Sequence, residues 1–192
     1  MLGNRGILHD DHKQIVRSAQ VRRWLTCVLE FKGIRRTIMA PHRYTELFFL
    51  DEATALAAGH RPCCECRHQA YRTFQSCWRD AVSEQTSADD MDRRLQADRR
   101  LRGGSKKTFQ APCEDLPTGT FIGYGRQAWL VCDVHLLRWT PGGYTERGAR
   151  PDELVTVLTP RSTVAVLRAG YMPGLHVSAT DAEASRAGKR LS

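Results

Sequence analysis

Three cysteines within four consecutive residues constrain this chain more than any other feature: Cys63, Cys64 and Cys66. Cys63 and Cys66 form a C-x2-C pair, a spacing that lets two thiolates reach one metal ion from a tight turn. Arg61 and Arg67 flank the cluster and favour the thiolate form. The chain has seven cysteines, an odd number, and its first residues contain no apolar export segment, so a disulfide framework is not expected. The cluster therefore predicts metal binding, with buried free thiols and a redox pair as alternatives.

Short apolar runs separated by Gly, Pro and polar residues predict an α+β fold, a single domain of short antiparallel strands with a few helices. Two runs around Gly33 predict a β-hairpin (24–31 and 34–39), and a third strand is expected within 44–50. Further strands are expected as a meander over 120–140 and at 154–159.

Helical spacing and capping residues predict helices over 52–58, 67–83 and 87–102. Asp51 is the expected N-cap of the first helix, and Gly59 its stop. The third segment is highly charged, so we expect an exposed helix inside a mobile insertion at about 84–107. The domain would span 1–178, and 179–192 would form a disordered basic tail.

Residues 47–62 and 158–173 resemble each other at an offset of 111 residues. Each copy reads as a strand, a capped short helix, a Gly stop and a Pro turn, with Asp51 and Ser162 as the corresponding N-caps. This pattern predicts an internal repeat, although any strand–helix–turn unit needs a cap and a stop.

A net charge of +8 favours a polyanionic partner, nucleic acid above all and DNA in particular. The basic side chains selected as phosphate contacts are Arg61, Arg67, Arg99, Arg100, Lys106 and Lys107. No run of 18 uncharged apolar residues is present, so neither a membrane span nor a membrane partner is expected, and the cytoplasm is the expected compartment.

The segment at about 45–66 resembles the zinc-binding domain of Ada-type DNA alkylation-repair proteins. The likeness lies in a strand that leads into Glu52-Ala-Thr-Ala-Leu-Ala-Ala-Gly59, followed by Arg61-Pro-Cys63 and Cys66. It implies Zn²⁺ on Cys63 and Cys66 in a domain that approaches DNA phosphates. That family has a further cysteine pair just before the strand, one member of which accepts a methyl group, whereas residues 33–50 contain no cysteine. The resemblance therefore does not extend to methylphosphotriester repair.

Additional zinc ligands would have to come from elsewhere in the chain. The candidates are His60, His42, His176, Cys64 and Cys27. The whole chain is also similar to a family of uncharacterised bacterial proteins, in the stretches 3–10, 43–50, 137–144 and 158–163. That likeness implies no activity.

An enzyme is the alternative reading of the polar N-terminal segment. His9 and Asp10 lie in a Gly-flanked stretch, and together with His60 they would suit a metal-dependent phosphodiesterase or nuclease. A metal-free interaction protein is the third alternative. Sequence alone thus favours a zinc-binding, nucleic-acid-associated α+β protein.

Overall fold

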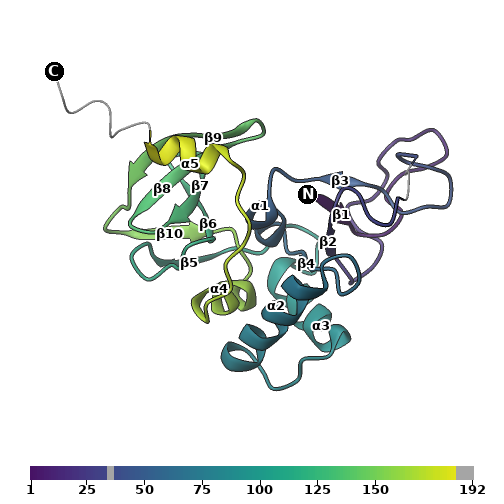
Figure 1. The fold of residues 1–192 in the computed structure, drawn as a ribbon, viewed down its shortest axis with the longest axis horizontal. Helices are drawn as coiled ribbons and strands as arrows, with labels where there is room; N and C mark the ends of the chain where they lie inside the picture. Colours follow the sequence, from purple (N-terminus) through teal and green to yellow (C-terminus); the bar gives the residue numbers. More distant parts are fainter. Residues whose placement is uncertain (34–36, 185–192) are drawn as a thin grey trace.

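The computed structural model describes residues 1–33 and 37–184. It contains two sheets at opposite ends of the molecule, with helices between and below them and the C-terminal helix along the top of the larger sheet (Figure 1). The smaller sheet has the order β3-β1-β2-β4. Its strands are β1 (Leu2–Asn4), β2 (Leu25–Cys27), β3 (Leu47–Phe48) and β4 (Arg61–Pro62). Pairing is antiparallel except between β2 and β4, which run parallel.

The larger sheet is antiparallel throughout, in the order β5-β10-β6-β7-β8-β9. Its strands are β5 (Phe109–Pro112), β6 (Phe121–Tyr124), β7 (Gln127–Cys132), β8 (His135–Thr140), β9 (Gly143–Ala149) and β10 (Leu154–Val157). The predicted meander is confirmed, and β9 extends it beyond the loop at Pro141. With the helices, the two sheets confirm the α+β class.

The helices are α1 (Glu52–Ala57), α2 (His68–Ala81), α3 (Ala88–Arg99), α4 (Arg161–Arg168) and α5 (Ser178–Ala184). The first three confirm the predicted helices, and the Asp51 side chain caps α1 by accepting a hydrogen bond from the Thr54 N–H at 2.8 Å. Among the described helices, none has both the length and the apolar character needed to cross a bilayer.

The predicted hairpin is wrong, because β2 pairs with strands distant in sequence. Its neighbours are β1 in antiparallel register and β4 in parallel register. Part of the expected second hairpin strand, residues 34–36, lies outside the described residues, and residues 37–39 are not in a strand. Parallel β2–β4 pairing joins the segment after Trp24 to the segment after Gly59, which is where the cysteines lie.

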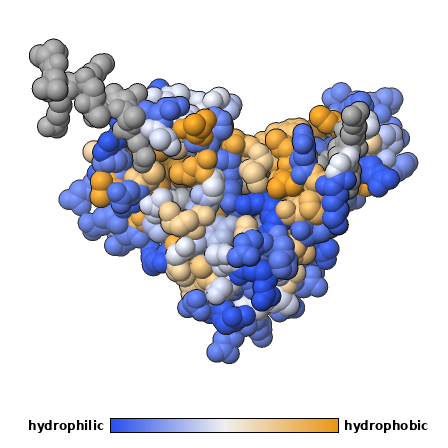
Figure 2. Space-filling view, in the orientation of Figure 1, coloured by the Kyte–Doolittle hydropathy of each residue, from blue (hydrophilic) through white to orange (hydrophobic). Residues whose placement is uncertain are grey.

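The third helix is packed into the fold, which corrects the expectation of a mobile insertion. Met91 and Leu95, spaced i and i+4, are fully buried against α2 and α4. Asp92 is buried in an ion pair with Arg61, a residue of β4 in the smaller sheet. The lower tip of the molecule, where α2 and α3 lie in Figure 1, is strongly hydrophilic on its outer surface in Figure 2. Two buried apolar side chains and a buried ion pair therefore help to hold this charged helix against the rest of the fold.

The C-terminal helix corrects part of the expected disordered tail. Ala179 and Ala182 of α5 are buried in the core beside Tyr144 of β9, and the Ser178 hydroxyl accepts a hydrogen bond from the Tyr144 N–H at 2.9 Å. These contacts keep 178–184 helical; residues 185–192 lie outside the described residues.

The two similar segments share the same helix ending. After α1, the His60 N–H donates to the Ala55 carbonyl and the Gly59 N–H to Leu56; after α4, Tyr171 donates to Val166 and Gly170 to Leu167. Both glycines have positive φ, 90° and 101°, the Schellman arrangement. The rest of the likeness fails: Ser162 lies inside α4, whose N-cap is Pro160, and β10 ends before residue 158.

Candidate metal centre

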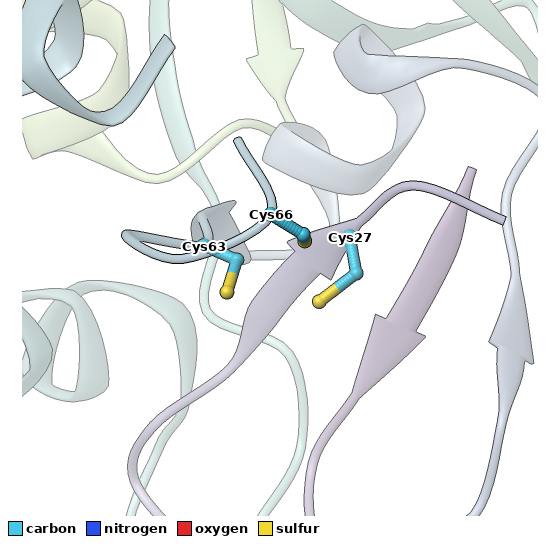
Figure 3. Close-up of side chains that lie close together, drawn as sticks. All are labelled: Cys27, Cys63 and Cys66. Atoms are coloured by element: carbon cyan, nitrogen blue, oxygen red, sulfur yellow. The ribbon is translucent and has the colours of Figure 1, made fainter. Parts of the chain in front are cut away.

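Parallel pairing of β2 with β4 brings a third cysteine to the C-x2-C pair. Thr26 is aligned with Pro62, and the Cys63 N–H donates to the Thr26 carbonyl at 3.1 Å. Cys27 and Cys63 are therefore neighbours, although they are 36 positions apart in sequence. Cys66 completes the group, and the three Sγ atoms lie within 4.8 Å of one another (Figure 3).

A tight turn between β4 and α2 places Cys66 back beside Cys63. The turn closes when the Arg67 N–H donates to the Cys63 carbonyl at 3.2 Å, and α2 begins at the next residue. Tetrahedral zinc with Zn–S bonds of 2.3 Å needs sulfur atoms about 3.8 Å apart. The three Sγ atoms, all within 4.8 Å of one another, are near enough to bind one metal ion together.

The three thiols lie close enough to change one another's pKa. A hydrogen bond with the Cys27 thiol, together with the N–H groups of Cys66 and Glu65, lowers the pKa of Cys63 below its usual range. The pKa of Cys27 is raised mainly by the same hydrogen bond and, to a smaller extent, by burial. Burial also raises the pKa of Cys66. Cys63 is thus the thiolate that its neighbours stabilise, and a cation at the centre would favour the same form in all three.

The other predicted ligands do not join this group among the described residues. His60 is fully buried elsewhere: the Arg5 Nε–H donates to its Nε2 at 3.3 Å, so its Nδ1–H donates to the Ala55 carbonyl at 3.2 Å. Burial and the nearby Arg5 charge hold the pKa of His60 well below its ordinary value. His60 is therefore a neutral core residue, not a ligand.

His42, His176 and Cys64 are also outside the cluster. His42 lies in an exposed turn at positive φ. The His176 N–H donates to the Asp51 carboxylate at 3.1 Å, and its ring contacts Ser178. Cys64 is exposed. Of the five candidate ligands, the geometry selects Cys27.

The predicted phosphodiesterase residues are not assembled into a metal site in the part of the chain that the structure describes. The His9 ring contacts the Thr45 hydroxyl at 2.6 Å. Asp10 accepts hydrogen bonds from the N–H groups of His12 and Gln14, which makes it a turn-forming residue. Among the described residues, His9, Asp10 and His60 therefore do not form one group of candidate metal ligands.

Two arginines that were selected as phosphate contacts are instead structural. Arg61 is 1% exposed and binds both oxygens of Asp92, at 2.9 and 2.8 Å. Arg67 binds both oxygens of buried Glu52, at 2.6 and 2.8 Å. Both arginines form ion pairs that join separate elements of the fold. Their guanidinium groups are therefore occupied by carboxylates and are not phosphate contacts, in contrast to the prediction.

The other four basic candidates lie near the C-terminal end of α3. Arg99 is 2% exposed, and its guanidinium donates to the carbonyls of Gly59 and Arg22. Arg100, Lys106 and Arg99 line a pocket with two residues that the sequence analysis did not select, Arg5 and Trp24. Lys107 is exposed and donates to the Ala97 carbonyl outside that pocket.

No protein-family model, curated protein or solved structure matches the chain significantly. The case for a candidate metal centre therefore rests on the geometry of the three cysteines.

Proposed function

We propose that this protein binds one zinc ion through Cys27, Cys63 and Cys66 and associates with nucleic acid. The observation that carries the metal assignment is the convergence of three sulfur atoms within 4.8 Å from two segments distant in sequence. Cys63 is buried and Cys27 and Cys66 are half-buried, and clustered thiols of this kind are typical ligands of zinc.

The donor set favours zinc. Thiolates are soft ligands, and a site built from them selects Zn²⁺ over Mg²⁺ or Ca²⁺, which take oxygen ligands. The described chain brings three donors together, so a solvent molecule or an external ligand would occupy the fourth position.

A metal here would stabilise the smaller sheet. Its strands are only two or three residues long, too short to be stable through backbone pairing alone. An ion held by Cys27, Cys63 and Cys66 would join β2 to the β4–α2 turn, and its binding energy would contribute directly to folding.

Charge supports the nucleic-acid part of the proposal. The net charge is +8, and several of the cations near the end of α3 have no carboxylate partner among the described residues. Cations without a carboxylate partner attract phosphates, and their binding releases counterions from the nucleic acid.

Metal content tests the zinc assignment directly. Purified protein should contain about one zinc per chain by plasma mass spectrometry, and Cys27→Ser should lose it. Cys64→Ser is the matched control, because Cys64 is exposed in the same turn, and it should keep the metal. Zinc retained by Cys27→Ser, or lost only in Cys64→Ser, would contradict the assignment. A chain without zinc that is unaffected by chelator would favour the metal-free interaction protein.

Fluorescence anisotropy tests the proposed association with nucleic acid. It measures binding to a labelled DNA oligonucleotide over a range of salt concentrations. The affinity should fall linearly on a double-logarithmic plot as salt rises. Absence of binding at low salt would contradict nucleic-acid association and leave the zinc assignment intact.

A further inference from the structure

A pocket of about 280 Å³ lies beside the start of β2, and its lining is strongly basic. Its charged residues come from separate parts of the chain: Arg5 follows β1, Arg99 and Arg100 end α3, and Lys106 follows the Gly103–Gly104 turn. Ser18, Trp24, Ala58 and Gly104 complete the wall. The fold therefore gathers four cations around one small opening.

Trp24 holds two of these cations at close range. The guanidinium carbons of Arg5 and Arg99 each lie 3.9 Å from the centre of its ring, and that of Arg100 lies 5.9 Å away. The indole is 4% exposed, so it is a support for the arginines and not a free surface for stacking on a base. Cation–π contacts of this kind stabilise each guanidinium but leave its charge in place.

The described residues supply no carboxylate to neutralise the pocket. None of the four cations forms an ion pair there. Asp92, whose charge acts on Arg99, is already bound through both oxygens by Arg61.

The neutral partners of the cations fix their positions. The Lys106 ammonium donates to the Ala57 carbonyl at 2.7 Å, and Arg100 donates to the Gly104 carbonyl and the Ser18 hydroxyl, each at 3.0 Å. Arg5 uses its Nε–H on His60, and among the described residues its two terminal nitrogens have no hydrogen-bond partner. The site is thus ordered before any ligand binds, and donors remain for one.

Burial, and after it the neighbouring positive charges, lower the pKa values of three of these groups. Burial, with the Arg100 charge, lowers the pKa of Arg5 to about 10. Burial lowers that of Arg99 to about 9 and that of Lys106 to about 8, the latter with help from Arg5. An anion in the pocket would relieve the repulsion among these charges, since opposite charge favours the protonated forms.

We propose that the pocket formed by Arg5, Trp24, Arg99, Arg100 and Lys106 binds a phosphate group. A doubly charged tetrahedral oxyanion accepts hydrogen bonds from several directions, which suits donors that converge from three segments. The volume is at the lower limit of ligand sites, so it fits a phosphate with little attached to it. The phosphate belongs either to a nucleic-acid strand, in which case the pocket depends on the proposed nucleic-acid association, or to a free small molecule.

Strand β2 connects this pocket to the metal centre. Trp24 immediately precedes β2 and Cys27 ends it, and the Trp24 carbonyl accepts a hydrogen bond from the Arg61 N–H at 3.0 Å. Zinc at Cys27 would fix the strand that carries the indole. The experiments therefore use zinc-loaded full-length protein, with the metal content of each sample measured.

Calorimetric titration with inorganic phosphate tests the pocket, with Lys106→Gln and Lys107→Gln as a matched pair. Both variants remove one charge from adjacent lysines, but only Lys106 lines the pocket. Lys106→Gln should weaken phosphate binding at least tenfold, and Lys107→Gln less than twofold. Arg100→Gln should weaken it similarly to Lys106→Gln, whereas Arg102→Gln, at an exposed position, should not.

Competition distinguishes the two sources of the phosphate. If inorganic phosphate displaces a 5′-phosphorylated oligonucleotide more effectively than the same strand without that phosphate, the pocket holds a nucleic-acid end. If it displaces neither, the pocket serves a free phosphate compound.

Two results would overturn the proposal. One is the absence of phosphate binding at millimolar concentration in zinc-loaded protein, a result that would not affect the zinc assignment. The other is an equal effect of Lys106→Gln and Lys107→Gln, which would assign binding to diffuse surface charge.

Discussion

Asp92→Asn is expected to destabilise the protein more than any exposed substitution on α3. The Asp92 side chain is 4% exposed, and that of Arg61 is 1% exposed. The two form hydrogen bonds of 2.9 and 2.8 Å. Replacing the carboxylate by an amide keeps the shape but leaves a buried guanidinium without a counter-charge. Removing one partner of such a pair costs about 3–5 kcal/mol.

The loss is measured by urea unfolding followed through tryptophan fluorescence, in zinc-containing buffer. For a chain of this size, that free energy corresponds to a melting temperature roughly 6–20 °C lower. Asp89→Asn on the same helix is the control: its side chain is 78% exposed and lies 3.7 Å from Arg23, so the loss should stay below about 1 kcal/mol.

A double variant separates the uncompensated charge from the lost contact. Arg61→Met/Asp92→Leu removes both charges and should recover most of the stability, because apolar replacement of a buried pair is often neutral. If Asp92→Asn costs no more than Asp89→Asn, the ion pair does not anchor α3, and the reasoning for a docked helix fails.

Three further predictions concern the surroundings of the site. Gly59→Ala should destabilise by at least about 1 kcal/mol, because φ is +90° and a Cβ would lie 2.6 Å from the Arg99 side chain; chemical denaturation measures this, and no loss would contradict it. Tyr171→Phe should cost about 1.5–3 kcal/mol, since it removes a 2.6 Å hydrogen bond to the buried Glu52 carboxylate; a change in melting temperature under 1 °C would refute that role. Sulfate affinity should be constant below about pH 7 and decline through pH 8, because Lys106, with a pKa of about 8, loses its proton over that range beside Arg5, Arg99, Arg100 and His60. Calorimetry at several pH values tests this, and a decline that persists in Lys106→Gln would assign it to another group.

Local signals predicted those elements whose determinants lie close together in sequence. The Asp51 cap and the Gly59 stop bound α1, and the apolar spacing after Arg67 marks α2. The meander β6–β8 follows from consecutive apolar runs with short turns. In each case the residues that determine the element lie within it or beside it.

The errors concern pairings between distant segments. β1 is three residues long and is stabilised by strands that begin at Leu25 and Leu47, so its own sequence carries almost no signal. The hairpin was predicted because local turn chemistry was stronger than any visible cue for parallel β2–β4 pairing. α3 seemed exposed because the partner of Asp92 lies 31 residues away in sequence.

In the candidate site, too, the sequence predicts the features with local determinants and not those that depend on pairing between distant segments. The C-x2-C pair was identifiable from spacing, whereas Cys27 could be only one of several candidates until β2 was aligned with β4. Arg5 and Trp24 join the basic pocket through cation–π contacts between distant positions, and no local pattern indicates these contacts.

X-ray absorption at the zinc edge tests the central claim most directly, because it counts the atoms bound to the metal. The account predicts a shell of three sulfur atoms at about 2.3 Å and one nitrogen or oxygen atom, with one sulfur lost or the metal released in Cys27→Ser. A four-sulfur shell, a shell of nitrogen and oxygen alone, or a spectrum unchanged in Cys27→Ser would contradict a zinc centre built from Cys27, Cys63 and Cys66.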